Sequence, residues 1–251
     1  MIDIHTHVLP HIDDGARDSK TALEMLRMEA EQGVKTVVLS SHYYGKKRSP
    51  EQFFEKRTAN FERIKSRIPQ DIEVRLAAEV HYTGVNMPED EQICRFAIEG
   101  TKYILIEFPF TEAWTFELLD RLSSFIANTG YTPIIAHAER YKEIHKNPAL
   151  LNELIGMGCL IQVNAGSFLG GREKKLAYAM LKHGFVHCIG SDAHDTKKRA
   201  PCMAQAKARF EKLGLGALWD RAQDIMDGIL ANQAIHVQIG EPIKKVLFWY
   251  V

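Results

Sequence analysis

Seven short runs of apolar and β-branched residues recur along the chain, separated by stretches with helical periodicity. The runs are Ile2–His5, Val34–Ser40, Ile72–Ala78, Tyr103–Phe108, Pro133–Ala136, Leu160–Val163 and Val186–Ile189. Strands that alternate with helices predict a parallel sheet with helices packed against it. No linker rich in Pro, Gly or Ser divides the chain, so we expect one α/β domain over residues 1–251. About seven such units favour a closed or nearly closed barrel over an open sheet, although the pattern alone allows both.

Charge and cysteine content exclude several classes of protein. The chain has 32 basic and 32 acidic residues, whereas a dedicated nucleic-acid-binding protein carries a basic excess. No apolar run reaches the roughly 18 residues of a membrane span, and the first residues have no secretory signal pattern. The four cysteines form no CxxC pair, and none is followed six residues later by the arginine of cysteine-dependent phosphatases. We expect a soluble cytoplasmic protein without a nucleic-acid partner.

Histidine and acidic residues gather where the predicted strands end. In parallel α/β folds, sites form at the carboxyl ends of the strands, and six of the seven predicted strands end there in His, Asp or Glu. Residues two apart on a strand project to the same side, so one ion can bind a pair of such residues. The candidate ligands are His5, His7, Asp14, His42, Glu79, Glu107, His137, Asp192 and His194. Imidazole and carboxylate ligands without thiolate suit Mn, Fe or Zn and disfavour a structural zinc site.

Each of these residues, taken alone, has a simpler explanation. Glu79 and Glu107 could be capping or surface ion-pair residues, Asp14 could shape a turn, and His137 could be a core residue. Their coincidence at one face of the fold favours a multinuclear metal site instead. The histidines expected on helical or surface stretches, and not as ligands, are His81, His145, His183 and His236. His11 lies in the first loop and could approach the site.

Basic residues flank the same loops. Arg140 follows His137 by three residues, and Arg199 ends the run Lys197–Arg199 shortly after His194. A guanidinium group binds phosphate with two parallel hydrogen bonds. A second basic run, Lys46–Arg48, follows the end of another predicted strand. An electropositive rim around a metal site favours a phosphorylated or acidic substrate.

The chain resembles the PHP (polymerase and histidinol phosphatase) superfamily, and within it the bacterial manganese-dependent protein-tyrosine phosphatases of capsule and exopolysaccharide loci. The matching stretches are Met1–His7, Asp13–Gly15, Ser41–His42, Ala78–Val80, Leu105–Phe108, Ala136–Tyr141, Gln162–Asn164 and Val186–His194. The Asp-Asp-Gly and His-x-Glu-Arg-Tyr blocks indicate this branch in particular. The resemblance covers essentially the whole chain and implies a distorted (β/α)7 barrel of the PHP type.

The resemblance also implies a site for up to three metal ions, with Mn²⁺ favoured and Fe or Zn as alternatives. The implied ligands are His5, His7, Glu79 and Asp192 for the first ion; Glu79, Glu107 and His137 for the second; and Asp14, His42 and His194 for the third. Arg140 and Arg199 match positions that contact the phosphate and the transition state. His42 or His194 could also assist catalysis where metal binding leaves a nitrogen free.

We therefore expect hydrolysis of phosphotyrosine by a metal-activated hydroxide. The resemblance implies that the substrate is the tyrosine-rich tail of a bacterial tyrosine kinase from a capsule or exopolysaccharide locus. A small-molecule phosphatase of the histidinol-phosphate type and a metal-loaded binding module without activity are the alternatives. The sequence leaves open the oligomeric state, and whether the aromatic side chains near the expected mouth of the site bind substrate or only pack. These aromatic residues are Tyr43, Tyr44, Phe110 and Trp114.

Overall fold

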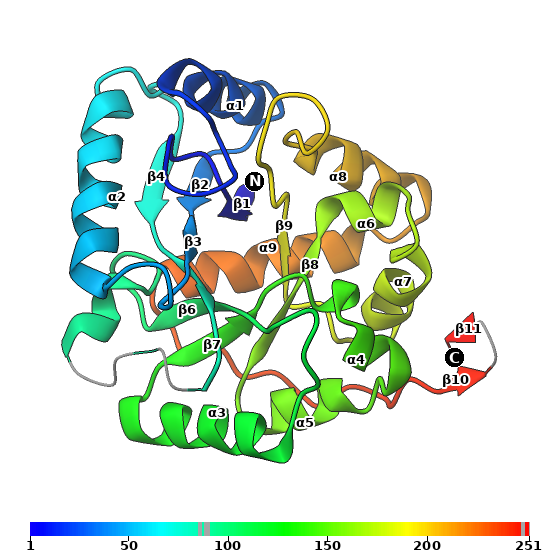
Figure 1. Ribbon diagram of the computed structural model, residues 1–251. Coiled ribbons are helices and arrows are strands. Elements are labelled where there is room, and N and C mark those ends of the chain that lie inside the picture. Colours follow the sequence, from blue (N-terminus) through cyan, green and yellow to red (C-terminus); the bar gives the residue numbers. More distant parts are fainter. Residues whose placement is uncertain (85–86, 88–90, 247–248, 251) are drawn as a thin grey trace.

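A curled parallel sheet with helices around its outside forms the centre of the molecule (Figure 1). The computed structural model describes residues 1–84, 87, 91–246 and 249–250. The parallel strands are β1 (Ile2–Thr6), β2 (Thr36–Leu39), β3 (His42–Tyr43), β4 (Glu73–Leu76), β5 (Glu79–His81), β6 (Tyr103–Glu107), β7 (Thr132–Ile135), β8 (Leu160–Asn164) and β9 (Cys188–Gly190). The α/β fold with a parallel sheet that the sequence predicts is confirmed.

Two of the seven predicted strands are each broken into two short strands. The run at residues 34–40 gives β2 and is followed directly by β3, and the run at residues 72–78 gives β4 and is followed directly by β5. The first pieces pair in the order β1-β2-β4, whereas the second pieces join the order β3-β5-β6-β7-β8-β9. The two broken strands pair with each other on both sides of their breaks, but β1 pairs only with the first part, through β2, and β6 only with the second part, through β5.

The two ends of the curled sheet meet at the carboxyl ends of the strands. Thr6 and Ala193 form a parallel bridge, and the backbone N–H of His7 donates to the carbonyl of Ala193 at 2.8 Å. The backbone N–H of Asp192 donates to the carbonyl of His5, also at 2.8 Å. The barrel is therefore distorted, and it closes between β1 and the loop after β9, where candidate ligands lie.

Helices begin and end where the local sequence favours it. The helices are α1 (Ser19–Glu31), α2 (Pro50–Lys65), α3 (Phe116–Thr129), α4 (Lys142–Lys146), α5 (Leu150–Gly156), α6 (Ala165–Leu169), α7 (Lys174–Lys182), α8 (Met203–Lys212) and α9 (Gly216–Leu230). Asp18 caps α1 by accepting from the backbone N–H of Thr21 at 2.7 Å. Ser49 and Gln52 form a capping box at the start of α2. Gly130 ends α3 in the left-handed region, with φ of 67°.

Apolar packing fills the amino-terminal half of the barrel and leaves the carboxyl ends polar. Side chains from β1, β6, β7 and β9 pack with Met226 and Ile229 of α9, which lies behind the sheet in Figure 1. The side-chain oxygen of Gln223, also in α9, accepts from the backbone N–H of Ile2 at 2.7 Å. The larger apolar cluster joins the sheet to the surrounding helices.

The last part of the chain contains two helices, α8 and α9, followed by a tail. Within the described ranges, that tail ends in a short antiparallel pair, β10 (Lys245–Val246) with β11 (Trp249–Tyr250). No helix among the described residues combines the length and the hydropathy that crossing a membrane requires.

Candidate metal centre

The structure brings all nine predicted ligand residues together at the carboxyl end of the barrel. They come from β1, β3, β5 and β6 and from the loops after β1, β7 and β9. Eight of them are buried, and Asp14 is the exposed member, with 65% of its side chain accessible. Two of the eight have left-handed backbone, His137 with φ of 34° and Asp192 with φ of 54°. Such backbone is costly for these residue types, and strain of this kind clusters at functional sites.

A first group of ligand atoms forms around His5, in β1, and His7, directly after β1. Nε2 of His5 and Nε2 of His7 lie 3.1 Å apart, and each lies 3.2 Å from Oε2 of Glu79. Oδ1 of Asp192 completes the group at 3.8 Å from His5 and 3.6 Å from His7. A tetrahedral site with bonds of about 2.1 Å has edges of about 3.4 Å between its ligand atoms. These distances therefore fit one divalent ion.

The second carboxylate oxygen of Glu79 faces a second group. Its Oε1 lies 2.8 Å from Nε2 of His137, which in turn lies 3.4 Å from Oε1 of Glu107. The two oxygens of Glu79 thus face different groups, the arrangement of a carboxylate that bridges two ions. His42 also contacts Glu79, since its Nδ1 lies 2.9 Å from Oε2.

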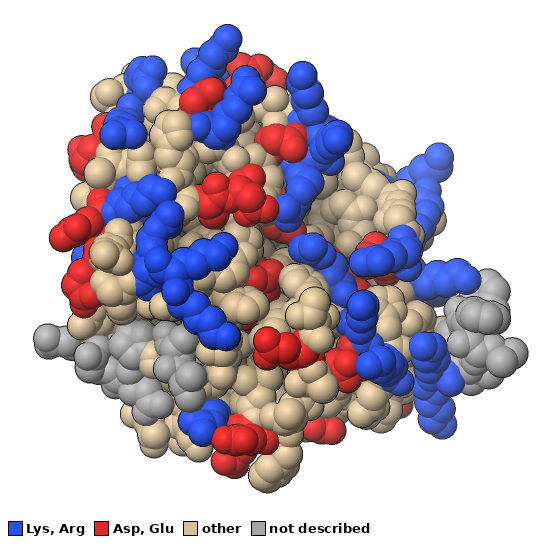
Figure 2. Space-filling view, viewed as in Figure 1, with Lys and Arg blue, Asp and Glu red and all other residues tan. Residues whose placement is uncertain are grey.

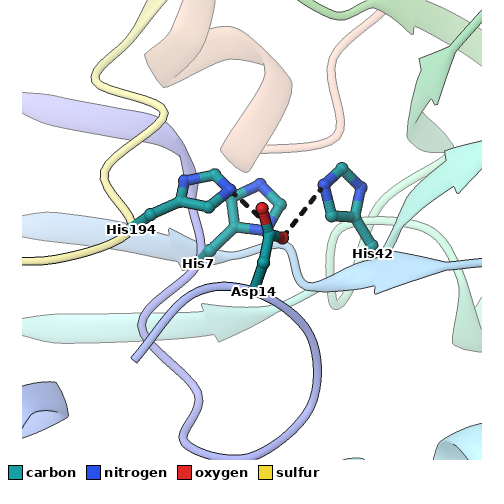
Figure 3. Close-up of side chains that lie close together, drawn as sticks. All are labelled: His7, Asp14, His42 and His194. Atoms are coloured by element: carbon teal, nitrogen blue, oxygen red, sulfur yellow. Dashed lines mark ion pairs between the residues drawn. The ribbon is translucent and has the colours of Figure 1, made fainter. Parts of the chain in front are cut away.

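A third group lies nearer the solvent. Figure 3 shows His7, Asp14, His42 and His194 converging, with Asp14 reaching up from the loop after β1. Oδ1 of Asp14 lies 3.6 Å from Nε2 of His42 and 3.6 Å from Nε2 of His194. The rings of His7 and His194 stack with centroids 3.8 Å apart. His42 therefore lies between two groups, with one nitrogen toward Glu79 and the other toward Asp14.

The carboxylates of the cluster are ionised at neutral pH. Burial by itself raises the pKa of Glu79, but His5 and His42 outweigh it and hold that pKa well below its usual range. The pKa of Glu107 lies at about 2, because hydrogen bonds from His137 and His81 outweigh burial and the nearby Glu79. A hydrogen bond from His194 lowers the pKa of Asp14. Ionised carboxylates are the form that binds a metal ion.

Four buried polar atoms of the ligand residues have no hydrogen-bond partner among the described residues. One is Nδ1 of His137, and the other three face another ligand atom. These three are Oε2 of Glu79, Nδ1 of His42 and Nε2 of His194. A buried polar atom without a partner is costly and calls for an explanation. Each of these three atoms faces another ligand atom of the cluster, so divalent cations would satisfy them. The residues present fit a multinuclear metal centre with N and O ligands.

Outer residues orient the histidines of the first group. Oδ2 of Asp13 lies 2.9 Å from Nδ1 of His7, and Oε1 of Gln162 lies 3.0 Å from Nδ1 of His5. Such partners hold a ligand histidine in one tautomer and one orientation. The sequence did not identify Asp13 or Gln162. Asp13 adjoins Asp14, and nothing in the sequence separates their roles.

The prediction for His81 was wrong. We expected it on a helical or surface stretch, but it lies in β5, two residues after Glu79. Its Nδ1 lies 3.2 Å from Oε2 of Glu107. The rule that residues two apart share one side of a strand would have found it. His145 lies in α4, His183 directly follows α7, and His236 is exposed in the tail after α9, as the sequence predicts.

Arg140 and Arg199 both reach the cluster through Asp192. Each donates to Oδ2 of Asp192, Arg140 at 3.2 Å and Arg199 at 2.8 Å. Their side chains are 34% and 39% exposed, so donor groups remain available to a ligand. Both line a cavity of about 340 Å³ over the cluster, here called the catalytic cavity. Its lining also includes His42, Tyr44, Glu107, Phe110, Thr111 and His137.

The aromatic residues near the mouth divide into two kinds. Tyr44 and Phe110 line the catalytic cavity. Tyr43 is buried against Phe96, with ring centroids 4.6 Å apart, and Trp114 packs on Phe108 at 4.4 Å. Only Tyr44 and Phe110 are therefore placed to contact a bound aromatic ring. His11 is exposed and lies outside the ligand groups.

Fold and cluster together define a barrel-type α/β protein with a candidate multinuclear metal centre at the carboxyl ends of its strands. A family model described as "Capsular polysaccharide synthesis, CpsB/CapC" matches residues 1–223. The chain belongs to this CpsB/CapC family.

Named relatives agree with the family. The chain is 32% identical over 255 residues to tyrosine-protein phosphatase YwqE of Bacillus subtilis, covering 98% of this chain and 97% of that protein. It is 32% identical over 215 residues to tyrosine-protein phosphatase CpsB of Streptococcus pneumoniae, covering 82% and 88%. A crystal structure from work on YwqE and CpsB, described there as unique metal-dependent tyrosine phosphatases, superposes with a TM-score of 0.84 at 32% identity. That superposition covers 98% of this chain and 100% of the other. The lactonase Lmo2620 of Listeria monocytogenes shares the fold alone, with a TM-score of 0.56 at 11% identity over 94% of this chain and 95% of the other.

Proposed function

We propose that this protein is a metal-dependent tyrosine-protein phosphatase that uses up to three ions, with Mn²⁺ preferred over Fe or Zn. The observation that carries the proposal is the position of Glu79, whose two oxygens face separate ligand groups, while two arginines contact Asp192 of the same cluster. That arrangement suits phosphoryl transfer, where two ions act on the attacking and leaving oxygens. The names of the relatives YwqE and CpsB support the same activity.

The nine ligand residues divide into three sites in this proposal. His5, His7, Glu79 and Asp192 would hold the first ion; Glu79, Glu107 and His137 would hold the second; and Asp14, His42 and His194 would hold the third. When bound, the ions supply Lewis acidity that activates water at neutral pH and offsets charge on the phosphoryl group. Asp13 orients the imidazole of His7, and Gln162 orients the imidazole of His5.

Arg140 and Arg199 bind the phosphoryl group. Both now donate to Asp192 from partly exposed side chains, and each guanidinium has further N–H donors to offer. A phosphoryl group over the cluster would accept these donors, and the added charge of the transition state strengthens the contacts. Tyr44 and Phe110 flank the phenol ring of the substrate. The tyrosine leaving group has a pKa of about 10, so it needs less protonation than a serine alkoxide.

We propose further that the substrate is a phosphotyrosine-bearing protein, in particular the tail of a bacterial tyrosine kinase. The family description, capsular polysaccharide synthesis, supports a substrate from that process. We also propose that residues 1–251 act as one domain.

We propose that the protein acts in a reducing, cytoplasmic compartment, because its four cysteines are all free thiols.

The proposal is tested with chelator-stripped protein, assayed with and without Mn²⁺ on a phosphotyrosyl peptide and on histidinol phosphate. Phosphate release from the peptide that requires Mn²⁺ is the expected result. Faster turnover of histidinol phosphate would keep the metal centre and overturn the substrate. Hydrolysis of neither compound by metal-loaded protein would favour a binding module.

A further inference from the structure

A second cavity adjoins the catalytic cavity. It has a volume of about 590 Å³, and its lining residues are Phe110, Thr111, Arg140, Lys142, His145, Lys146 and Arg172. We call it the basic cavity. Phe110, Thr111 and Arg140 line both cavities. The guanidinium of Arg140 stacks over the ring of Phe110, with 4.9 Å from Cζ to the ring centroid, and this pair forms the boundary between the two spaces. A chain bound in one cavity can therefore continue into the other.

Cationic side chains dominate the basic cavity. Four of its lining residues are Lys or Arg, and its described lining includes no carboxylate. Figure 2 shows Lys and Arg gathered over α4 and the start of α7, beside the central hollow. Lys146 pairs with Glu143 at 2.8 Å, and Arg172 pairs with Glu173. Lys142 has no ion pair within the part of the chain that the structure describes, so positive charge remains available to a ligand.

The histidine in the basic cavity does not offset this charge. Burial lowers the pKa of His145, and the charges of Lys245 and Arg172 lower it further, so the ring is neutral at pH 7. Nδ1 of His145 lies 2.7 Å from the hydroxyl of Tyr250, and this hydrogen bond orients the imidazole ring. Part of the lining is apolar, because the ring of Phe110 lines the cavity and stacks on Tyr141 with ring centroids 5.0 Å apart. The cavity thus combines a partly apolar lining with unpaired positive charge.

The other basic run at the rim is less available. The ammonium of Lys47 lies over the ring of Tyr44, 4.5 Å from its centroid, and Arg48 donates to the carbonyl of Ile12 at 3.0 Å. Lys47 and Arg48 thus have partners within the protein, whereas Lys142 of the basic cavity has no ion pair among the described residues. The basic cavity is therefore the stronger candidate for binding part of a ligand.

We propose that the basic cavity binds a second anionic side chain of the substrate, close in sequence to the phosphotyrosine. This inference deepens the proposed function and depends on it. With the phosphotyrosine in the catalytic cavity, Arg140 contacts its phosphoryl group. Lys142 and the two terminal nitrogens of Arg172, whose Nε pairs with Glu173, remain to bind the second anion. The apolar part of the lining accommodates the stem of that side chain. Clusters of Lys and Arg recognise acidic or phosphorylated motifs in this way.

Position-scanned peptides test this subsite. Each peptide contains one phosphotyrosine in a neutral background, with Glu, phosphoserine or Gln placed in turn at each neighbouring position. At one position at least, Glu or phosphoserine should raise kcat/KM by about 3- to 10-fold over Gln, mainly through KM, as expected for charge-assisted contacts at a partly exposed site. The better of the two anions identifies the ligand as a carboxylate or a phosphate.

Variants then locate the effect. The preference for the anionic peptide, measured as a ratio within each protein, should fall to below about 2-fold in Lys142→Gln and in Arg172→Gln. Lys65→Gln, an exposed lysine at the end of α2, is the matched control and should keep the wild-type ratio. Equal hydrolysis of anionic and Gln peptides by wild type, or a ratio that persists in both variants, overturns the subsite. Failure to hydrolyse any phosphotyrosyl peptide with Mn²⁺ present would instead overturn the proposed function.

Discussion

Oδ2 of Asp13 lies 2.9 Å from Nδ1 of His7, on the far side of the ring from the nitrogen that faces the ligand cluster. The same oxygen also accepts the backbone N–H of His42 at 2.7 Å. Asp13 thus connects two candidate ligand residues without joining a ligand group itself. Its pKa lies at about 2, because His7 and His42 outweigh the effect of burial. Two adjacent aspartates in one loop therefore have different positions, Asp13 behind the cluster and Asp14 within it.

Asp13→Asn should weaken metal binding while leaving the ligand set complete. Losing the carboxylate behind a ligand histidine typically costs 10- to 100-fold in metal affinity or activity, so we expect an Mn²⁺ concentration for half-maximal activity about 10-fold or more higher. Saturating Mn²⁺ should restore most of the turnover. Titration of activity with Mn²⁺ measures this, and the exposed Asp120→Asn on α3 is the control. An unchanged Mn²⁺ requirement in Asp13→Asn would contradict the role of Asp13.

Arg140→Lys and Arg199→Lys should each lower kcat/KM for a phosphotyrosyl peptide by about 10- to 100-fold, because lysine cannot reproduce the paired donors of a guanidinium. Metal content should stay close to wild type, since neither arginine is a ligand. Steady-state kinetics and metal analysis on the same samples separate the two effects. Arg121→Lys, on the exposed side of α3, should behave as wild type. Full activity in both variants would exclude the two arginines from phosphate binding.

Much of this arrangement was predictable because the geometry of strands is local. Residues two apart share one side of a strand, and parallel strands align their carboxyl ends, so His5 and His7 could be placed beside Asp192 from the sequence alone. The breaks in the second and third predicted strands could not be predicted from the sequence. At the first break, Ser40 Oγ accepts the backbone N–H of Thr6 at 3.0 Å, a contact with a strand 34 residues away. Long-range pairing of this kind leaves no pattern in the sequence.

The residues that contact and orient the ligand histidines also could not be predicted from the sequence. Gln162 lies inside a predicted strand, and its role depends on a contact with His5 across 157 positions. The same oxygen of Gln162 accepts the backbone N–H of His137 at 2.7 Å. Composition and periodicity show that such a residue is in a strand, but they do not show which atoms its side chain meets.

Glu79→Gln should remove bound metal and activity together. Replacing one oxygen of Glu79 by an amide removes a charged ligand from two groups at once, because its oxygens face His5 and His7 on one side and His137 on the other. We expect loss of most bound Mn²⁺ and a fall in kcat of at least about 1000-fold, with the far-UV circular dichroism unchanged. Metal analysis after gel filtration tests this against Glu55→Gln, an exposed position on α2. Retention of full metal content would exclude Glu79 as a bridge.

His187 should make the folded state less stable at acid pH. It is buried behind the sheet, where its Nδ1 accepts the backbone N–H of Ile161 at 3.0 Å. Burial, and to a smaller extent the charge of Arg221, lowers its pKa from 6.5 to about 4. Between these two values the unfolded chain binds a proton that the folded protein does not. The free energy of unfolding is therefore highest above pH 6.5 and falls as the pH decreases toward 4.

Replacing this histidine by glutamine removes the titration and keeps an acceptor for the backbone N–H. The contribution of one such group is up to about 3 kcal/mol, from 1.36 kcal/mol for each pKa unit. Urea unfolding in the presence of a chelator, from pH 7 to pH 4, should therefore show a shallower loss of stability for His187→Gln than for wild type. The other titrating groups are shared, so they cancel in the difference between the two proteins. The exposed His236→Gln should follow the wild-type curve. Parallel curves for wild type and His187→Gln would show that the buried imidazole does not set this part of the acid sensitivity.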